Sequence, residues 1–303
     1  MERTVAGTAR RTKVIPIIVP ILIAFIITIA ITPSCKQAAP KLSGLCFSPY
    51  LGETPKEAYP VKGLLDRVAP YAKGIRTFGS TGVWAKIPPV ARQLGLYLAA
   101  GAGLYDDKKY NGAQVAGLIK MVKTGMVDLA VVGDEVLLWK TVPEDELISY
   151  IRRVKATGIP TTTSDYWGEL LSHKKVMREV DVVIMNIYPF SKGVSVDSAV
   201  DYVDSAYRKV KANAEGKEVI VETGWPSAGD AQRKAVPSSK NAARYLSEFT
   251  SWARSNGVRY FYFEAFDEPW KSRAEGSVGG HWGLWDRDGH MKQYTRSVLN
   301  EAP

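Results

Sequence analysis

The chain has 303 residues, of which 46% are hydrophobic and 10% aromatic, a composition that excludes an intrinsically disordered protein and allows one large domain or two smaller ones. Its net charge is +9, but the cations after the N-terminal segment are scattered along helix-like stretches such as 151–157 and 206–212. We therefore expect no nucleic-acid partner.

The N-terminal segment differs from the rest of the chain. An uncharged apolar run at 14–31 is preceded by four cations, namely Arg3, Arg10, Arg11 and Lys13. A run of about 18 apolar residues is just long enough to cross a bilayer, and cations before it favour a cytoplasmic start of the chain. We therefore predict export of the following residues, with the membrane as a partner and the folded body facing the periplasm or the cell exterior.

Two fates of this segment stay open. The run can remain as an uncleaved anchor, or it can be removed as a signal segment. Ser34 before Cys35 resembles a bacterial lipoprotein junction, so cleavage can accompany lipidation of Cys35, whereas cleavage alone would give a secreted protein. In either case residues 1–40 form a basic start, a hydrophobic segment and a short linker, and residues 41–303 form one folded domain.

Eight short apolar segments follow in the body, and each ends in small, polar or aromatic residues. Near-continuous apolar segments of this length are typical of the buried strands of a parallel sheet. They lie at 44–50, 74–79, 96–103, 128–135, 160–167, 181–190, 218–225 and 259–266.

Helical patterns with clear end signals separate these strands. The segment at 141–158 has a proline and three acids near its start and a glycine after its last turn, and the segment at 238–257 begins with serines and ends in glycine. Eight strand–helix units in about 260 residues match a TIM barrel, for which roughly 250 residues are typical. The predicted fold class is therefore α/β, a single (β/α)₈ TIM barrel after the N-terminal segment.

Two glutamates stand where predicted strands end. Glu135 is near the end of the fourth strand and Glu222 near the end of the seventh. Active sites of such barrels lie at the C-terminal ends of the strands, so both carboxylates can face one central cleft. Each glutamate alone also suits a salt bridge at the barrel top. Together they match the two carboxylates of a glycosidase, of which one protonates the leaving oxygen and the other attacks the sugar or activates water.

Aromatic residues support a carbohydrate-binding groove. Seven tryptophans follow strand candidates or lie after the eighth strand: Trp84, Trp139, Trp167, Trp225, Trp270, Trp282 and Trp285. A flat ring can stack on the apolar face of a pyranose while its edge stays in water. Any one of these rings is equally consistent with a cap on the barrel core, but their clustering favours a groove for sugars.

Several motifs occur in a fixed order along the body. They are IRTFGS at 75–80, VVGDEVL at 131–137, NIYPF at 186–190, VIVETGWPSAG at 219–229 and FYFEAFDEPWK at 261–271, followed by GGHWGLWDRDG at 279–289. In this order they resemble glycoside hydrolase family 17, which contains β-1,3-glucanases and β-1,3-glucan transglycosylases, and especially its bacterial and fungal branches. The resemblance covers the body from Gly44 to about Tyr294.

The resemblance implies roles for individual residues. It implies a retaining mechanism with Glu135 as the general acid/base and Glu222 as the nucleophile, with their carboxylates roughly 5–5.5 Å apart. It further implies that Tyr188 orients the nucleophile and that Arg76 helps to keep it ionised. The remaining implied site residues are a carboxylate–lysine pair and three tryptophans: Glu268, Lys271, Trp225, Trp270 and Trp282.

Asp134 departs from the family pattern. The family usually has asparagine directly before the acid/base, where its amide can hydrogen-bond the 2-hydroxyl of the sugar. An ionised Asp134 can accept from that hydroxyl but has no amide donors, and its charge raises the proton affinity of Glu135. Because hydrogen bonds to the 2-hydroxyl strengthen in the transition state, the substitution bears on the rate and on the balance of hydrolysis and transfer.

We expect neither a metal nor another cofactor. The three histidines have no ligand-like spacing, and the GAG at 101–103 lacks the rest of a phosphate-binding fingerprint. The expected partner is a β-glucan polysaccharide or oligosaccharide, and the expected state is a monomer. Two alternatives stay open: a membrane-tethered glucan-binding protein with weakened chemistry, and a glycosidase that acts on another β-glycan.

Overall fold

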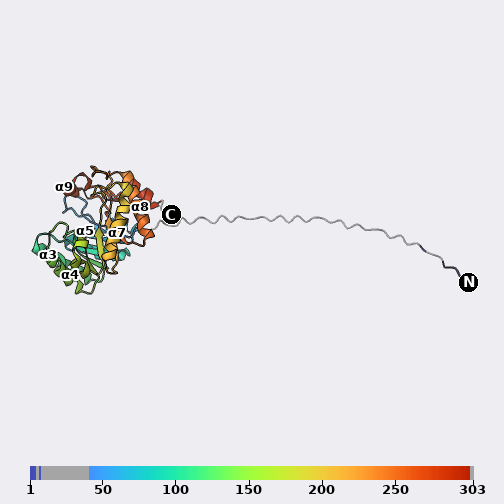
Figure 1. Cartoon of the computed structure of the whole chain (residues 1–303), viewed down its shortest axis with the longest axis horizontal. Helices are drawn as coiled ribbons and strands as arrows, with labels where there is room; N and C mark the ends of the chain where they lie inside the picture. The colour runs from blue at the N-terminus through green and yellow to red at the C-terminus, as the bar shows by residue number, and fades with distance from the viewer. Residues whose placement is uncertain (5–6, 8–40, 301–303) are drawn as a thin grey trace. The chain divides into compact units, whose positions relative to one another are not determined.

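Figure 1 shows the computed structural model of the chain, which describes residues 1–4, 7 and 41–300. The predicted membrane segment at 14–31 and the predicted lipidation site at Cys35 lie outside these described residues. Within the described ranges, no helix combines the length and the apolar character needed to cross a membrane.

A closed parallel barrel forms in the second of the two units into which the chain divides, Ala38–Pro303. The strands are β1 Leu45–Cys46, β2 Gly74–Arg76, β3 Tyr97–Ala102, β4 Leu129–Asp134, β5 Thr161–Tyr166, β6 Val183–Asn186, β7 Val219–Thr223 and β8 Tyr260–Tyr262. Each strand pairs in parallel with the next, and β1 pairs with β8 to close the barrel. The predicted barrel is confirmed, and each observed strand lies within a predicted strand segment.

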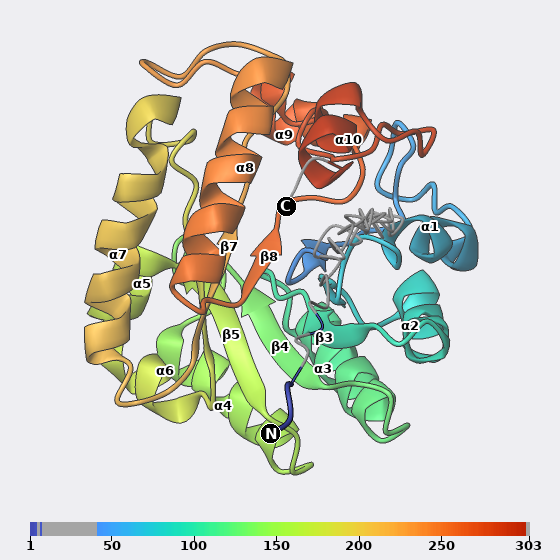
Figure 2. The same ribbon diagram turned by 90° about the vertical axis from the view of Figure 1, so that its right-hand side faces the viewer.

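Helices surround the strands, as Figure 2 shows for β3, β4, β5, β7 and β8. The α-helices are α1 Val61–Val68, α2 Ile87–Gln93, α3 Lys108–Val122, α4 Glu144–Lys155, α5 Trp167–Ser172, α6 Lys174–Glu179, α7 Ala199–Asn213, α8 Ser239–Ser255, α9 Ser272–Glu275 and α10 Gln293–Asn300. Short 3₁₀ turns are η1 Gly82–Lys86, η2 Val196–Ser198, η3 Pro269–Lys271 and η4 Gly276–Val278. Together the α-helices form the outer layer that a parallel sheet requires.

The end signals predicted for the helices now identified as α4 and α8 are confirmed. In α4, acids fill the first turn and bases the last, which complements the helix dipole. At the start of α8, the Ser238 hydroxyl accepts the backbone N–H of Asn241 at 3.1 Å, and Gly257 follows the helix with φ +63°. These features fix where each helix begins and ends.

Two apolar layers stabilise the barrel. One cluster comprises Cys46, Ala99, Leu129, Val131, Ile184, Ile220 and Phe261, all from strands. The larger cluster includes buried side chains of both the strands and the helices. Because successive strand residues point to opposite faces, one apolar strand contributes to both layers, and its polar end is left for the rim of the barrel.

Candidate active site

Glu222 is buried at the C-terminal end of β7, with 1% of its surface exposed. The Tyr188 hydroxyl donates to its Oε1 at 2.8 Å, and Nε of Arg76 lies 3.0 Å from its Oε2. Burial raises the pKa of Glu222, the charge of Arg76 opposes this rise, and the charge of Asp134 adds to it. The ionised carboxylate is thus supported by one cation and one neutral donor.

Glu135 follows β4 and has a different environment. The Asn186 amide lies 3.3 Å from its Oε1, and the indole N–H of Trp139 donates to its Oε2 at 3.0 Å. Burial and the charge of Asp134 raise the pKa of Glu135 to about 7, although the two donors oppose the rise. A carboxyl group that holds its proton near neutral pH can act as a general acid.

Asp134 connects the surroundings of the two glutamates. Its Oδ1 accepts from Nη2 of Arg76 at 2.6 Å and from the Asn186 amide at 3.3 Å. Arg76 therefore contacts both Asp134 and Glu222, and Asn186 contacts both Asp134 and Glu135. Charge added or removed at Asp134 acts on both glutamates.

A bulge at the end of β4 directs these side chains. The β4–β5 register shifts between Val131 and Asp134, and Gly133 has φ +84°. Glu135 follows with φ +51°, a strained value for a residue with a side chain, and its N–H bonds to the Ser164 carbonyl at 2.8 Å. Bulges beside active sites commonly re-aim side chains, and this one places consecutive acidic residues in a single network.

Asp165 on β5 holds the segment that follows Glu135. Its carboxylate accepts the backbone N–H groups of Leu137 at 2.7 Å, Leu138 at 3.2 Å and Tyr166 at 2.8 Å. Burial raises the pKa of Asp165 to about 6, against the effect of these three donors. This buried carboxylate compensates the strained backbone around the acid/base candidate.

A second charged cluster lies after β8. Nζ of the buried Lys271 contacts Oε2 of Glu264 at 2.5 Å and also forms an ion pair with Glu268. Burial raises the pKa of Glu264 well above its usual range, with Lys271 opposing and Glu268 adding to the rise. The structure therefore brings the predicted Glu268–Lys271 pair together and adds a second carboxylate.

The predicted sugar contact at Trp225 is wrong. This side chain is 0% exposed and packs against Phe190 and Tyr245, with ring centroids 5.5 and 5.4 Å away. Its indole N–H donates to the carbonyl of Val236 at 3.2 Å. With both its ring and its donor satisfied inside the protein, Trp225 is a core residue.

The other two predicted tryptophans differ in exposure, since Trp282 is buried and Trp270 is partly exposed. Trp282 is 5% exposed and packs edge-on against Tyr188 and Phe263, each with a centroid distance of 5.7 Å. It thereby supports the tyrosine that donates to the Glu222 carboxylate. Trp270 is partly exposed, and its N–H donates to the Tyr50 carbonyl at 3.0 Å, which leaves part of its ring accessible.

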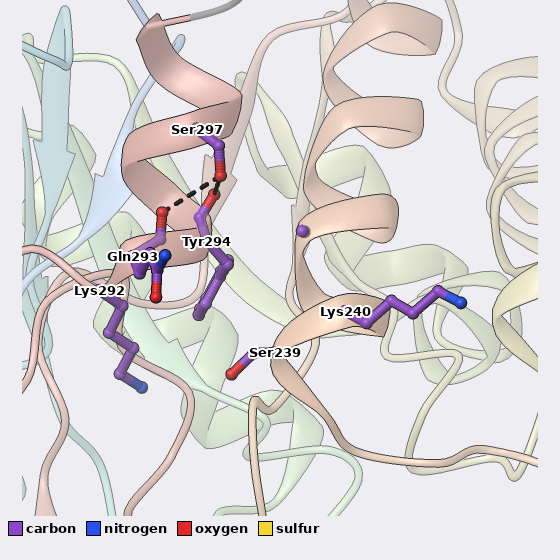
Figure 3. A pocket seen from close by; sticks show the side chains of 7 residues that line it. Ser239, Lys240, Lys292, Gln293, Tyr294 and Ser297 are labelled. Carbon is purple, nitrogen blue, oxygen red and sulfur yellow. Dashed lines mark hydrogen bonds between the residues drawn. The ribbon is translucent and has the colours of Figure 1, made fainter.

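A surface pocket lies between the start of α8 and the region of α10 (Figure 3). It is lined by Ser239, Lys240, Ala243, Lys292, Gln293, Tyr294 and Ser297. Nζ of Lys292 bonds to Asp267 at 2.7 Å. None of the lining residues is acidic, so this pocket cannot supply a proton donor and a nucleophile of the kind found on β4 and β7.

One group of side chains has the spacing of a cation site. Asp286, Asp288 and His290 bring their ligand atoms within 4.8 Å of one another on the loop after β8. The backbone N–H groups of Asp288 and His290 donate to Oδ1 of Asp286. Asp288 and His290 are exposed. This arrangement is an ordinary acidic turn.

Three residues of the site and of the second charged cluster were missed in the sequence: Asn186, Asp165 and Glu264. Asn186 ends β6, Asp165 is the second-last residue of the threonine-rich strand β5, and Glu264 lies two residues after β8, so all three are polar residues at or near strand ends. The same signal identified Glu135 and Glu222. Applying it to every polar residue at a strand end, and not to these two glutamates alone, would have found all three.

A closed parallel barrel with acidic side chains at the C-terminal ends of β4 and β7 is the arrangement of many glycoside hydrolases. The profile of the BtgE/BtgC glycoside hydrolase domain matches residues 44–283. The chain belongs to this family, within glycoside hydrolase family 17, and is a glycosidase.

Relatives and solved structures agree with this assignment. The chain is 26% identical to the glucan 1,3-beta-glucosidase BGL2 of Candida albicans, over 79% of this chain and 87% of the relative. A glycoside hydrolase family 17 β-1,3-glucanosyltransferase from Rhizomucor miehei is 28% identical, with a TM-score of 0.75, and covers 84% of this chain and 96% of its own. An active-site mutant of the Rhizomucor enzyme in complex with laminaritriose has 27% identity, a TM-score of 0.75 and the same coverage of both chains.

Proposed function

We propose that the protein is a retaining β-1,3-glucan hydrolase or glucanosyltransferase in which Glu135 is the acid/base and Glu222 the nucleophile. The observation that carries the proposal is the contrast between their environments. Glu222 lies 3.0 Å from the Arg76 cation, whereas Glu135 contacts neutral donors and has a pKa raised to about 7. Two carboxyl groups in such different environments suit opposite roles at one pH.

The first half of the reaction uses Glu135 as an acid. Its carboxyl proton passes to the glycosidic oxygen while an oxygen of Glu222 attacks the anomeric carbon. The bond between the anomeric carbon and the glycosidic oxygen breaks, the leaving sugar departs as an alcohol, and a glycosyl ester forms on Glu222. The Tyr188 hydroxyl, 2.8 Å from Oε1, and Arg76 orient the attacking carboxylate.

The second half uses Glu135 as a base. Its carboxylate takes a proton from water or from a sugar hydroxyl, whose oxygen attacks the anomeric carbon and displaces Glu222. Two inversions restore the β configuration. Water gives hydrolysis, and a sugar hydroxyl gives a longer glucan.

The substrate class is supported by the names of similar proteins. The Candida relative is named as a glucan 1,3-beta-glucosidase, and the Rhizomucor enzyme as a β-1,3-glucanosyltransferase, whose mutant was solved with laminaritriose. These similarities cover 79% and 84% of this chain, and the match to the BtgE/BtgC glycoside hydrolase domain at 44–283 includes both glutamates.

The test is incubation of the protein with laminari-oligosaccharides, with products followed by mass spectrometry and the first anomer formed followed by NMR. We expect β products that are shorter or longer than the substrate and that disappear in Glu222→Gln and Glu135→Gln. The surface variant Glu248→Gln serves as a matched control. Initial α products would contradict the retaining mechanism. Binding without any product would favour a glucan-binding protein, and products from other β-glycans alone would favour a different substrate.

We also propose that the apolar run at 14–31 exports the barrel and tethers it to the membrane. The proposal is supported by the length of the run and by the cations before it. In cells that make the full chain, the barrel should sediment with membranes and be released by detergent but not by high salt. Mass spectrometry of the detergent-released protein distinguishes the two tethers, since an acylated N-terminal Cys35 shows lipidation and an intact 14–31 segment shows an anchor. A barrel that stays in the cytosol would refute the export proposal.

A further inference from the structure

Trp139 is the most exposed tryptophan side chain in the described part of the chain, at 69%. It lies four residues after Glu135, and one helical turn links them, because the N–H of Trp139 donates to the carbonyl of Glu135 at 3.0 Å. Side chains four residues apart in such a turn lie on the same side. The turn thus holds an exposed indole next to the acid/base candidate.

The orientation of the ring follows from its hydrogen bond. The indole N–H of Trp139 donates to Oε2 of Glu135 at 3.0 Å. An indole N–H lies in the plane of the ring, so the carboxylate meets the ring at its edge. No aromatic pair or cation–π contact involves Trp139 within residues 41–300, and its broad exposed surface is available to a ligand.

The position next to Glu135 identifies the sugar that this surface would meet. In the proposed mechanism Glu135 must touch the glycosidic oxygen, and Glu222 attacks the opposite face of the sugar that is transferred. Trp139 contacts the acid/base, whereas the contacts of Glu222 are Tyr188 and Arg76. A ring beside the acid/base therefore borders the sugar that leaves, and the same place receives an incoming acceptor sugar.

We propose that Trp139 is the binding platform for the sugar unit on the leaving-group side, and that it determines how the covalent intermediate divides between water and an acceptor sugar. The inference rests on the proposed function, since it needs Glu135 as the acid/base. An apolar face of a glucosyl unit would stack on the indole. The acceptor hydroxyl would then attack the anomeric carbon, its proton would pass to Glu135, and the ester bond to Glu222 would break.

Two variants separate the ring from its hydrogen bond. Trp139→Phe keeps an aromatic ring and loses the N–H, whereas Trp139→Ala loses both. Any change that arises from the lost bond to Glu135 is common to the two variants, so the difference between them reports the ring. Val236→Ala, which truncates another exposed apolar side chain, is the matched control.

The experiment uses laminaribiosyl β-fluoride as the donor and laminaribiose as the acceptor. Fluoride release reports formation of the intermediate without a sugar on the leaving-group side, and mass spectrometry gives the ratio of transfer to hydrolysis. We expect this ratio to be roughly three- to tenfold lower in Trp139→Ala than in Trp139→Phe, with a similar rise in the acceptor concentration that gives half-maximal transfer.

The outcomes are distinguishable. Equal ratios in Trp139→Ala and Trp139→Phe, together with normal fluoride release by the wild-type protein, would overturn the role of Trp139 and leave the proposed function intact. A wild-type protein that neither releases fluoride nor cleaves oligosaccharides would overturn both. A lower ratio in Trp139→Ala alone would support the acceptor platform.

Discussion

The guanidinium of Arg76, on β2, donates to the carboxylate of Asp134, at the end of β4, at 2.6 Å. The same guanidinium lies 3.0 Å from Glu222. One buried cation is therefore shared between the nucleophile candidate Glu222 and the carboxylate of Asp134. The resemblance described above implies asparagine at the position of Asp134. Because Arg76 also pairs with Asp134, it offsets the charge of Glu222 less completely than it would without Asp134. The charge of Asp134 raises the pKa of both Glu135 and Glu222.

Asp134→Asn should move the whole pH–activity profile to lower pH. In the proposed mechanism, activity requires a protonated Glu135 and is lost as the pH rises through its pKa, which is about 7. Removing the neighbouring charge lowers that pKa and also the pKa of Glu222, so both limbs should shift in the same direction. The measurement is kcat/KM against pH, with the exposed Asp106→Asn as control. An unchanged profile would refute the electrostatic role of Asp134.

Arg76→Lys should move the low-pH limb to higher pH and lower the rate. A lysine is a single point charge without the planar fork that lets Arg76 contact Asp134 and Glu222 together. In the proposed mechanism Glu222 attacks in its ionised form, and its pKa rises when its cation is lost or displaced. Arg76→Met should in addition reduce stability by about 3–5 kcal/mol, because it leaves the buried carboxylate of Glu222 without its cation. Arg92→Lys, at the surface, is the control, and an unmoved low-pH limb would contradict the pairing.

Asp165→Ala should reduce kcat more than it changes KM. Its carboxylate accepts the N–H groups of Leu137 and Leu138 and so holds the strained segment that positions Glu135. Leaving these buried donors without an acceptor costs roughly 1–3 kcal/mol of stability. Asp165→Asn keeps one carbonyl acceptor and should restore part of both losses. Denaturant unfolding and steady-state kinetics measure the two effects, and a loss of stability with kcat unchanged would show that Asp165 serves the fold alone.

Lys271→Met should destabilise the fold in a pH-dependent manner. The pKa of buried Glu264 is already raised well above its usual value, and Glu268 lies beside it. Without the lysine, ionising Glu264 inside the protein is more costly, whereas protonation of Glu264 removes the cost. Stability relative to wild type should therefore fall as the pH rises through the folded-state pKa of Glu264, which lies well above the ordinary glutamate value of about 4.5. Equal losses at pH 5 and pH 8 in denaturant unfolding would contradict this assignment.

Much of the fold was readable from local patterns because most strands are short apolar runs and several long helices have end signals. The acids in the first turn of α4 and Ser238 before α8 are examples in which local chemistry alone decides the boundary. The positions of Glu135 and Glu222 followed from the barrel, since the ends of parallel strands meet at one rim.

The details of the site depended on tertiary contacts that a sequence does not display. Trp225 follows a strand just as a sugar-binding ring would, but Phe190 and Tyr245 enclose it. Asn186 contacts Glu135 only because β6 and the bulged end of β4 approach each other from separate parts of the chain. Which polar strand ends meet, and which aromatic rings stay exposed, is decided by packing.

Because the first and last strands pair to close the barrel, the barrel cannot close until the chain has been synthesised as far as β8. Leu45 on the two-residue strand β1 pairs with Tyr262 on β8, so the first and last strands hold each other in place. While the nascent chain leaves the ribosome, β1 has no β8 partner until almost the whole domain has been translated, and contacts of such long sequence separation form slowly. A message truncated before β8 would leave two open sheet edges and no shared rim. Glu222 and Arg76, which are buried in the complete barrel, would then be exposed to solvent. Such a truncated chain would be bound by chaperones or degraded by proteases.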